Sequence, residues 1–277
     1  MRSFWRLGAF LAGCAVATSS GSAQAQRGDL IMPSELRVCA DPHNLPFSNE
    51  QLQGFENRIA AIIAADLRLP VAYVWFPQTV GFVRNTLRAR ACDLIMGAVS
   101  GDADMDTTSP YYHTGYMLVT RPADAITARS LGDPALAQKR FGLIAATPPT
   151  DLLLRHHLLG QTKSYALTVD TRFDNPSRSM LQDLIDGKID VALVWGPIVG
   201  FAIARDHLPL KAVFLEGEPD SPRLDYRIAM GVRSNEPEWR RRINQAISKH
   251  RAEIAAVLAE YGVDTIEEGA DGSAGKP

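Results

Sequence analysis

Residues 36–67 read LRVCADPHNLPFSNEQLQGFENRIAAIIAADL and pass from an apolar run through a polar loop into an amphipathic segment. The run LRVCA predicts a buried strand. The segment ENRIAAIIAADLR has its isoleucines spaced as on one face of a helix. A strand, a loop and a helix in this order form the beginning of an α/β fold.

The same alternation continues along the chain. VAYVWF predicts a strand, GFVRNTLRARA at 81–91 a helix, and CDLIMGAV a strand. After YYHTGYMLVTRP the pattern starts again, with RFGLIAA, SYALTV and IDVALVW as strands and PTDLLLRHHLL and SRSMLQDLIDG as helices. A strand, YRIAMGVR, and one long helix at 238–262 follow. Strands separated by helix-length connections need crossovers, so we predict two α/β units with mostly parallel sheets.

The first 25 residues predict a secretory signal peptide. Arg2 and Arg6 flank a short start, LGAFLAGCAVA supplies an apolar core, and SAQA ending at Ala25 is a small-residue cleavage site. A membrane anchor is one alternative, but the apolar stretch is shorter than the roughly 20 residues that span a bilayer. A second alternative is that LAGC is a lipoprotein processing box, which would leave a lipid on Cys14. We expect a periplasmic protein by either processing route.

Net charge and cysteine content restrict the possible functional classes. The net charge is −2, and −4 without Arg2 and Arg6, which argues against a nucleic-acid-binding surface. Only Cys39 and Cys92 remain after the leader, and in an oxidising compartment such a pair predicts a disulfide. A flavodoxin-like strand order would place the two close enough to bond. Two inert buried thiols are the alternative.

Two α/β units, two crossings and a terminal helix resemble the type II periplasmic solute-binding fold of the polar amino-acid class. The resemblance implies two lobes, each a mostly parallel sheet flanked by helices, with a ligand cleft between them. The implied divisions are a first lobe of 26–120 and 222–265, a second lobe of 121–221, and a disordered tail of 266–277. Because α/β sheets bind ligands at the carboxyl ends of their strands, the loop ADPHNLPFSN should face the cleft. A solvated turn punctuated by Pro42 and Pro46 is the alternative.

Binders of ordinary amino acids in this fold use three groups. These are an aromatic in the first loop, an arginine after the third strand for the α-carboxylate, and an acid in the second lobe for the amine. This chain has Asn44 in place of the aromatic and Trp195 in place of the acid. The loop after the third strand carries Asp102, Asp104 and Asp106 and no arginine. Since a carboxylate would meet like charge there, we predict that free α-amino acids do not bind.

Six segments resemble a narrower family, the J components of methanol oxidation (MxaJ-, XoxJ- and MoxJ-like proteins). These solute-binding relatives are encoded with pyrroloquinoline-quinone (PQQ) alcohol dehydrogenases. The segments are LRVCADPHNLPFSN, GFENRIA, WFPQTVGFVRNTLRARACDLIMG, TSPYY, DVALVWGPIVGFA and IAMGVR. The resemblance implies a periplasmic accessory protein whose partners are a quinoprotein alcohol dehydrogenase and its cytochrome c. It implies no cofactor bound to this chain.

We expect the cleft to be formed by residues of both lobes, namely Asp41, Asn44, Phe47, Phe55, Glu56, Trp75, Gly97, Ser100, Asp102, Asp104, Tyr111, Thr147 and Trp195. The segment ATPPT at 146–150 is either an anion site at a helix N-terminus or a helix start with proline in its first turn. Two prolines remove amide donors there, which favours the second interpretation. Adjacent His156 and His157 would point apart on a helix, so we predict a boundary and a surface histidine and no metal site.

The leading functional prediction is an accessory protein that helps a quinoprotein dehydrogenase to mature or take up cofactor, or docks to it. We expect docking around Asn44, Phe47, Asp102, Asp104 and Trp195, with an unpaired acidic loop that steers the approach. A solvated loop and a core tryptophan are the alternative. The other candidate function is an ABC-transporter receptor for a small solute other than a standard amino acid, with an aromatic-lined pocket. We predict no enzyme, because no nucleophile motif is present.

Overall fold

The computed structural model describes residues 34–267. The predicted signal peptide, the Cys14 processing box and the tail from residue 268 onwards lie outside the described residues. The strands are β1 (Leu36–Ala40), β2 (His43–Asn44), β3 (Ser48–Asn49), β4 (Val71–Trp75), β5 (Leu94–Val99), β6 (Asp106–Thr107), β7 (Tyr112–Thr120), β8 (Phe141–Ile144), β9 (Thr162–Tyr165), β10 (Val191–Trp195), β11 (Lys211–Phe214) and β12 (Asp225–Val232). The helices are α1 (Phe55–Leu67), α2 (Phe82–Asn85), α3 (Pro149–Arg155), α4 (Pro176–Ile185), α5 (Gly196–Ala204), α6 (Pro237–Lys249) and α7 (Arg251–Glu260), with 3-10 turns at Pro122–Asp124, Pro134–Leu136 and Leu159–Gln161.

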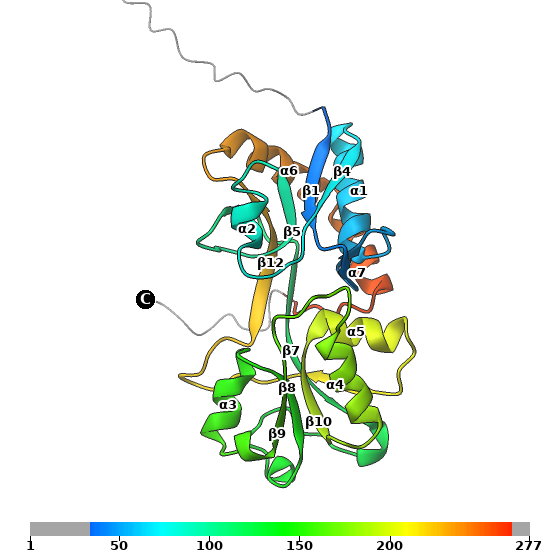
Figure 1. The fold of residues 1–277 in the computed structure, drawn as a ribbon, viewed down its shortest axis with the longest axis vertical. Helices are drawn as coiled ribbons and strands as arrows, with labels where there is room; N and C mark the ends of the chain where they lie inside the picture. Colours follow the sequence, from blue (N-terminus) through cyan, green and yellow to red (C-terminus); the bar gives the residue numbers. More distant parts are fainter. Residues whose placement is uncertain (1–33, 268–277) are drawn as a thin grey trace, which may run out of the picture. The chain divides into compact units, whose positions relative to one another are not determined.

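The main sheet has two parallel regions joined by antiparallel strands (Figure 1). Its order is β4-β1-β5-β12-β7-β10-β8-β9, with β11 paired to β7 and β6 paired to β12. In the described part of the chain, β1 pairs in parallel with β4 and β5, and β8 pairs in parallel with β9 and β10. Every antiparallel pair of this sheet includes β7 or β12. The predicted two-lobed α/β fold is confirmed.

Strand β7 changes its partner midway along its length. Residues 112–115 pair with 225–228 of β12, whereas residues 116–119 pair with 192–195 of β10. Strand β7 therefore contributes to the sheets of both lobes. The first lobe contains β1, β4, β5 and most of β12, and the second contains β8, β9, β10 and β11. The predicted lobe boundaries at 120/121 and 221/222 stay a prediction.

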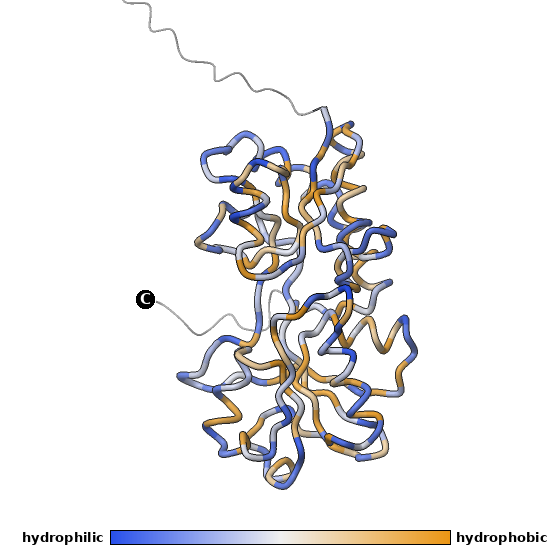
Figure 2. The backbone as a smooth tube through the Cα atoms, in the orientation of Figure 1, coloured by the Kyte–Doolittle hydropathy of each residue, from blue (hydrophilic) through white to orange (hydrophobic). Residues whose placement is uncertain are grey.

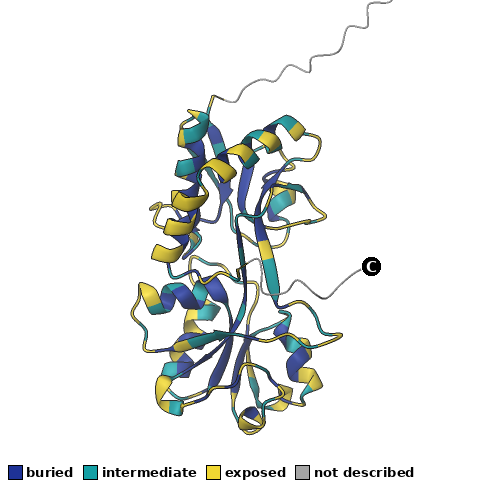
Figure 3. Cartoon of the chain, turned by 180° about the vertical axis from the view of Figure 1, so that it is seen from behind, coloured by how far each residue is buried: buried dark blue, intermediate teal, exposed yellow. Residues whose placement is uncertain are grey.

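Strand β10 of the second lobe is buried on both faces. Val191 and Leu193 pack in the cluster that contains Leu152 and Leu153 of α3, while its alternate residues Ala192 and Val194 pack in the cluster that contains residues of α4 and α5. A strand covered by helices on both sides is apolar at every position, as the run VALVW is. Figure 2 shows the same concentration of hydrophobic residues in the strands. Figure 3 shows that the strands are mainly buried and that the helices expose their outer faces.

The first lobe is built in the same way around β1. Leu36 and Val38 pack with α1, α6 and α7 in one cluster. Cys39, the next residue after Val38, points to the other face of the sheet and packs with Phe82 and Cys92. The predicted disulfide between Cys39 and Cys92 is present, with a Cα–Cα distance of 5.6 Å. The prediction that the first and third strands are neighbours is confirmed, because β1 pairs with β5, the third predicted strand.

Three helix predictions were wrong in their extent. The helix predicted over 149–159 is α3, which ends at Arg155. The helix predicted over 81–91 is only α2, which ends at Asn85. The hydroxyl of Thr86 donates to the carbonyl oxygen of Phe82, and the amide of Arg88 donates to the carbonyl five residues back, so the helical ladder is replaced by wider turns. The helix predicted over 238–262 is divided at His250, which has φ −102° and ψ 19°.

Strands β7 and β11 and helix α5 were not predicted. Helix α5 begins at Gly196–Pro197, a pair that usually marks a turn. Proline is nevertheless well suited to the first helical turn, where its missing amide hydrogen costs nothing. Helix α3 also has a proline in its first turn, Pro149, as the sequence predicted.

Candidate functional site

A cavity of about 260 Å³ lies between residues of the first and second lobes. From the first lobe it is lined by Asp41, His43, Asn44, Leu45 and Gln78, and from the second by Tyr116, Ile144, Thr147, Ala166, Leu167, Val169, Thr171, Asp174, Asn175, Pro176, Ser177, Leu193, Trp195 and Ile198. The loop after β1 thus faces a cavity. Of the predicted cleft residues, Asp41, Asn44, Thr147 and Trp195 line it.

Asp41 organises the first-lobe side of this cavity. It follows the end of β1 and is only 1% exposed. Its Oδ1 accepts hydrogen bonds from the amide of His43 at 2.8 Å and from the hydroxyl of Thr171 at 3.2 Å. Its Oδ2 accepts a hydrogen bond from the amide of Gln78 at 2.7 Å. One carboxylate therefore joins two loops of the first lobe to a loop of the second.

The polar loop after β1 also holds the start of helix α1. The amides of Phe55 and Glu56 donate to the carbonyl oxygens of Pro46 and Phe47, at 2.9 and 3.0 Å. Gly54 permits this close approach, because a Cβ at that position would lie 2.0 Å from the carbonyl oxygen of Phe47. The first amides of α1 are thus satisfied within the chain, and this helix end is not a ligand site.

The second-lobe wall of the cavity includes two aromatic side chains, Tyr116 and Trp195. Trp195, at the end of β10, contacts Tyr116 edge-on at 5.2 Å between ring centroids and Tyr226 at 5.9 Å. Burial raises the pKa of Tyr116 to about 12, and the neighbouring Tyr226 adds to the rise while a hydrogen bond with Thr147 opposes it. Tyr116 therefore stays a neutral phenol at any physiological pH.

Several predicted cleft residues pack in the first lobe away from the cavity. Phe55 is completely buried and contacts the ring of Phe47 at 5.4 Å. Trp75 stacks on Tyr73 with ring centroids 4.7 Å apart. The hydroxyl of Tyr111 donates to the carbonyl oxygen of Met96 at 3.0 Å. In this structure these aromatic side chains stabilise the first lobe.

The acidic loop is paired, contrary to our expectation of an unpaired loop. Asp104 forms an ion pair with Arg88 at 2.8 Å, and Asp106 forms one with Arg240 at 3.1 Å. Asp102 accepts a hydrogen bond from the amide of Asp104 at 2.7 Å. Arginines far from this loop in sequence supply the counter-charges, which the loop's own composition could not reveal. The nearby predicted residue Ser100 is exposed, and its amide donates to the backbone of β12.

Glu56 is a buried carboxyl group that lies against Gly97. A Cβ at Gly97 would come within 2.5 Å of Glu56 Oε1, so the glycine makes room for the carboxyl group. Burial raises the pKa of Glu56 to about 8. The pKa of Tyr112 is raised mainly by burial and further by the charge of Glu56. Neither Glu56 nor Gly97 lines the cavity.

We expect Glu56→Gln to flatten the pH dependence of stability. Because the pKa of Glu56 is higher in the folded protein than in the unfolded chain, wild-type stability falls as pH rises from about 4.5 towards 8. One pKa unit corresponds to about 1.4 kcal/mol, so this group should remove about 2 to 3 kcal/mol between pH 5 and pH 7. Urea unfolding of both proteins across this range measures the difference. Parallel pH profiles for wild type and variant would contradict the expectation.

Four large apolar side chains that line the cavity or lie close in sequence to its lining residues are exposed, and the sequence did not single them out. Leu45 and Leu167 line the cavity and are 37% and 56% exposed. Val80 and Phe173, which are close in sequence to the lining residues Gln78 and Asp174, are 89% and 83% exposed. We call these four residues the apolar rim. They come from both lobes, and only the fold brings their loops to one cavity.

The charge of the cavity differs from that of an amino-acid site. Among the described residues that line it, none is lysine or arginine, and two are aspartates. A ligand carboxylate would have no cationic partner there. Helix α3, which starts beside Thr147, has only seven residues and begins with proline, so it adds little to anion binding.

The two adjacent histidines differ in burial and in their contacts. His156 is half-buried and lies 2.6 Å from Glu218, while His157 is exposed. No group of three or more histidine, cysteine, aspartate or glutamate side chains within residues 34–267 is arranged to hold a metal ion. In the same part of the chain, no helix combines the length and apolar character needed to cross a membrane.

This two-lobed fold with a cavity between its lobes is that of a solute-binding protein. Residues 36–263 match the bacterial extracellular solute-binding proteins, family 3, and the chain belongs to this family.

Three relatives show which members of this family the chain is similar to. The chain is similar to the periplasmic binding protein XoxJ from Methylobacterium extorquens AM1, with 39% identity and a TM-score of 0.72, over 84% of this chain and 100% of that one. It is similar to MxaJ from Methlophaga aminisulfidivorans MPT, with 25% identity and a TM-score of 0.73, over 83% of this chain and 100% of that one. It is 27% identical to MoxJ of Paracoccus denitrificans over 246 residues, which cover 83% of this chain and 88% of that protein. The predicted resemblance to MxaJ-, XoxJ- and MoxJ-like proteins is confirmed.

Proposed function

We propose that this protein is a periplasmic, non-catalytic accessory protein of a quinoprotein alcohol dehydrogenase system. The observation that carries the proposal is the charge of the cavity. The protein has the solute-binding fold, but no lysine or arginine is present among the described lining residues to bind an α-carboxylate. The similarity to XoxJ, MxaJ and MoxJ gives the partner system. In the resembled family these proteins accompany PQQ-dependent methanol dehydrogenases. The signal peptide, the periplasmic location and the cytochrome c partner are parts of the same proposal.

The apolar rim is the part of the surface that we assign to docking. Exposed aromatic and aliphatic side chains around a hollow supply binding energy when a partner covers them, and aromatic residues contribute most. Phe173 projects from the loop between β9 and α4, and the guanidinium of Arg172 lies 5.4 Å from the centroid of its ring. Asn44 and Trp195 of the originally expected surface adjoin this rim through the cavity. Phe47 packs on Phe55 and Asp104 pairs with Arg88, so we assign docking to the apolar rim, and the role expected for Phe47, Asp102 and Asp104 stays a prediction.

We expect Phe173→Ala to weaken binding to the cognate quinoprotein dehydrogenase. Loss of an aromatic anchor costs about 2 kcal/mol, which corresponds to roughly a 30-fold rise in Kd. Surface plasmon resonance with immobilised dehydrogenase measures the change. Leu154→Ala is the matched control, because Leu154 is 60% exposed on α3 and does not line the cavity.

Two outcomes would contradict the docking proposal. One is equal binding by wild type and Phe173→Ala, and the other is absence of wild-type binding to the dehydrogenase. The second outcome would favour the alternative function, a transport receptor for a small solute other than a standard amino acid. That alternative is supported by the cavity itself, which is lined by residues of both lobes.

A further inference from the structure

Asp41 is a buried acid without a cationic partner. Its three hydrogen-bond donors are two backbone amides and one hydroxyl group, all neutral. No lysine or arginine of residues 34–267 forms an ion pair with it. Two other buried aspartates do have such partners, Asp93 with two arginines and Asp183 with two lysines. Burying a charge is costly unless an opposite charge accompanies it, so Asp41 stands out.

The position of Asp41 indicates where a counter-charge would come from. The residue lines the cavity, and a carboxylate has about four acceptor positions, of which three are used here. Two of the three bonds go to Oδ1, which leaves Oδ2 with a single donor, the amide of Gln78. A positively charged group in the cavity would complete the hydrogen bonding of Oδ2 and neutralise the buried charge.

The remaining walls suit a positive ligand with an apolar body. Trp195 and Tyr116 of the second lobe also line the cavity, and the faces of indole and phenol rings attract cations. Asp174 is a second acid among the lining residues. Ile144, Leu167 and Ile198 provide apolar contact. An anion would face two aspartates with no lysine or arginine among the described lining residues.

We propose that the cavity binds a small organic cation, an alkylammonium, with Asp41 as its counter-ion and Trp195 as its aromatic contact. The cavity volume of about 260 Å³ is near the lower limit for ligand sites, so the ligand must be small. The same arrangement rejects carboxylates, including a multiply charged quinone cofactor. This inference concerns the cavity and does not depend on docking to a dehydrogenase.

The test uses ligands of one shape and three charges: n-butylammonium, butan-1-ol and butyrate. Isothermal titration of the purified protein at pH 7 should show saturable binding of n-butylammonium, at least tenfold weaker binding of butan-1-ol, and none of butyrate. Choline, a quaternary ammonium without an N–H donor, should bind more weakly than n-butylammonium, through its charge and the aromatic contact. Absence of binding by both cations would overturn the proposal, and so would butan-1-ol or butyrate that binds as tightly as n-butylammonium.

Two variants assign the site within the protein. Asp41→Asn removes the charge and should weaken n-butylammonium binding by about tenfold or more. Trp195→Leu removes the aromatic face, leaves the loop after β1 unchanged, and should also weaken it, which keeps the test valid if Asp41→Asn fails to fold. Asp206→Asn, at an exposed acid outside the cavity, is the control and should bind as wild type does. Wild-type affinity in both site variants would show that the cation binds elsewhere and would overturn the assignment.

Discussion

Replacing Cys39 and Cys92 together with alanine should lower the free energy of unfolding by about 4 kcal/mol. The disulfide joins residues that are 53 positions apart, and closing so long a loop restricts the unfolded chain strongly. Both cysteines are buried, at 2% and 0% exposure, between β1 and the residues around Phe82 and Leu87. The alanine pair also leaves small cavities in this cluster, which adds to the loss.

Urea unfolding of wild type and the double variant measures this effect. Adding a thiol reductant during unfolding should bring the wild-type free energy close to that of the variant, whereas the variant itself should not respond. An intact mass that shows two free thiols in purified, unreduced wild type would contradict the disulfide itself. Equal unfolding free energies with the bond intact would contradict its stabilising role.

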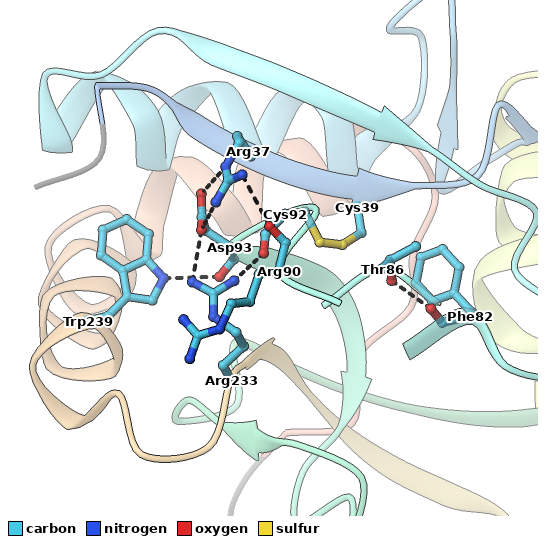
Figure 4. The surroundings of a disulfide bond; sticks show 9 residues. All are labelled: Arg37, Cys39, Phe82, Thr86, Arg90, Cys92, Asp93, Arg233 and Trp239. Carbon is cyan, nitrogen blue, oxygen red and sulfur yellow. Dashed lines mark hydrogen bonds and ion pairs between the residues drawn. A yellow bond between two sulfur atoms is a disulfide. The ribbon is translucent and has the colours of Figure 1, made fainter. Parts of the chain in front are cut away.

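Asp93→Ala should lower the free energy of unfolding by about 3 to 5 kcal/mol, the range expected when one member of a buried ion-pair network is removed. Figure 4 shows the network beside the disulfide. Arg37 of β1 donates two hydrogen bonds to the Asp93 carboxylate, at 2.7 and 2.8 Å, and Arg233 donates one at 2.9 Å. Trp239 of α6 donates to the carbonyl oxygen of Asp93 at 3.0 Å. Without the carboxylate, Arg37 loses its ion-pair partner, and Arg233 keeps only Glu236, at 2.7 Å.

The control for this experiment is Asp104→Ala. Its ion pair with Arg88 is solvent-exposed, with side chains 66% and 50% accessible, so its removal should cost only about 0 to 1 kcal/mol. Comparable losses from the two substitutions would show that burial does not strengthen the Asp93 network.

The pH dependence of this network follows from the pKa of Asp93. Burial opposes ionisation of its carboxyl group, but hydrogen bonds from Arg37 and Arg233 outweigh burial and hold its pKa below the usual value. A carboxyl group whose pKa is lower in the folded protein stabilises it above the unfolded pKa, near 3.8, and this contribution is lost as pH falls further. The difference in stability between wild type and Asp93→Ala should therefore be largest at neutral pH and shrink in acid.

Local patterns predicted most of the longer strands, but not β7 or β11, and they placed β9 too late in the chain. VALVW and LRVCA are strongly apolar because helices cover both faces of their sheets, and such runs are visible without any partner. Helix boundaries were less predictable. The residues around Thr86 and His250 continue the helical pattern, and only backbone conformation and contacts with distant residues end the helices there. His250, for example, lies 3.0 Å from Asp66 of α1.

The candidate site was predictable only in part, and the reason is physical. Asp41, Asn44, Thr147 and Trp195 follow strand ends, and strand ends in α/β sheets meet at one edge, so their sequence positions were informative. The loop that contains Thr171 and Phe173 also follows the end of a parallel strand, β9, so the same rule could have indicated it, but we did not select its residues. It reaches Asp41 across 130 residues because of how the chain crosses between the lobes.

The amino-acid sequence alone determined the α/β class, the two repeating units, the cysteine pair and the family, since these depend on hydrophobic period and on short motifs that neighbouring residues define. Tertiary structure decided which charges are paired. The acidic loop is neutralised by Arg88 and Arg240, whereas Asp41 is buried with only neutral donors. Ion pairing depends on distances of a few ångström between residues that are remote in sequence, and no local pattern contains these distances. They distinguish an acid paired within the protein from one that we propose pairs with a ligand.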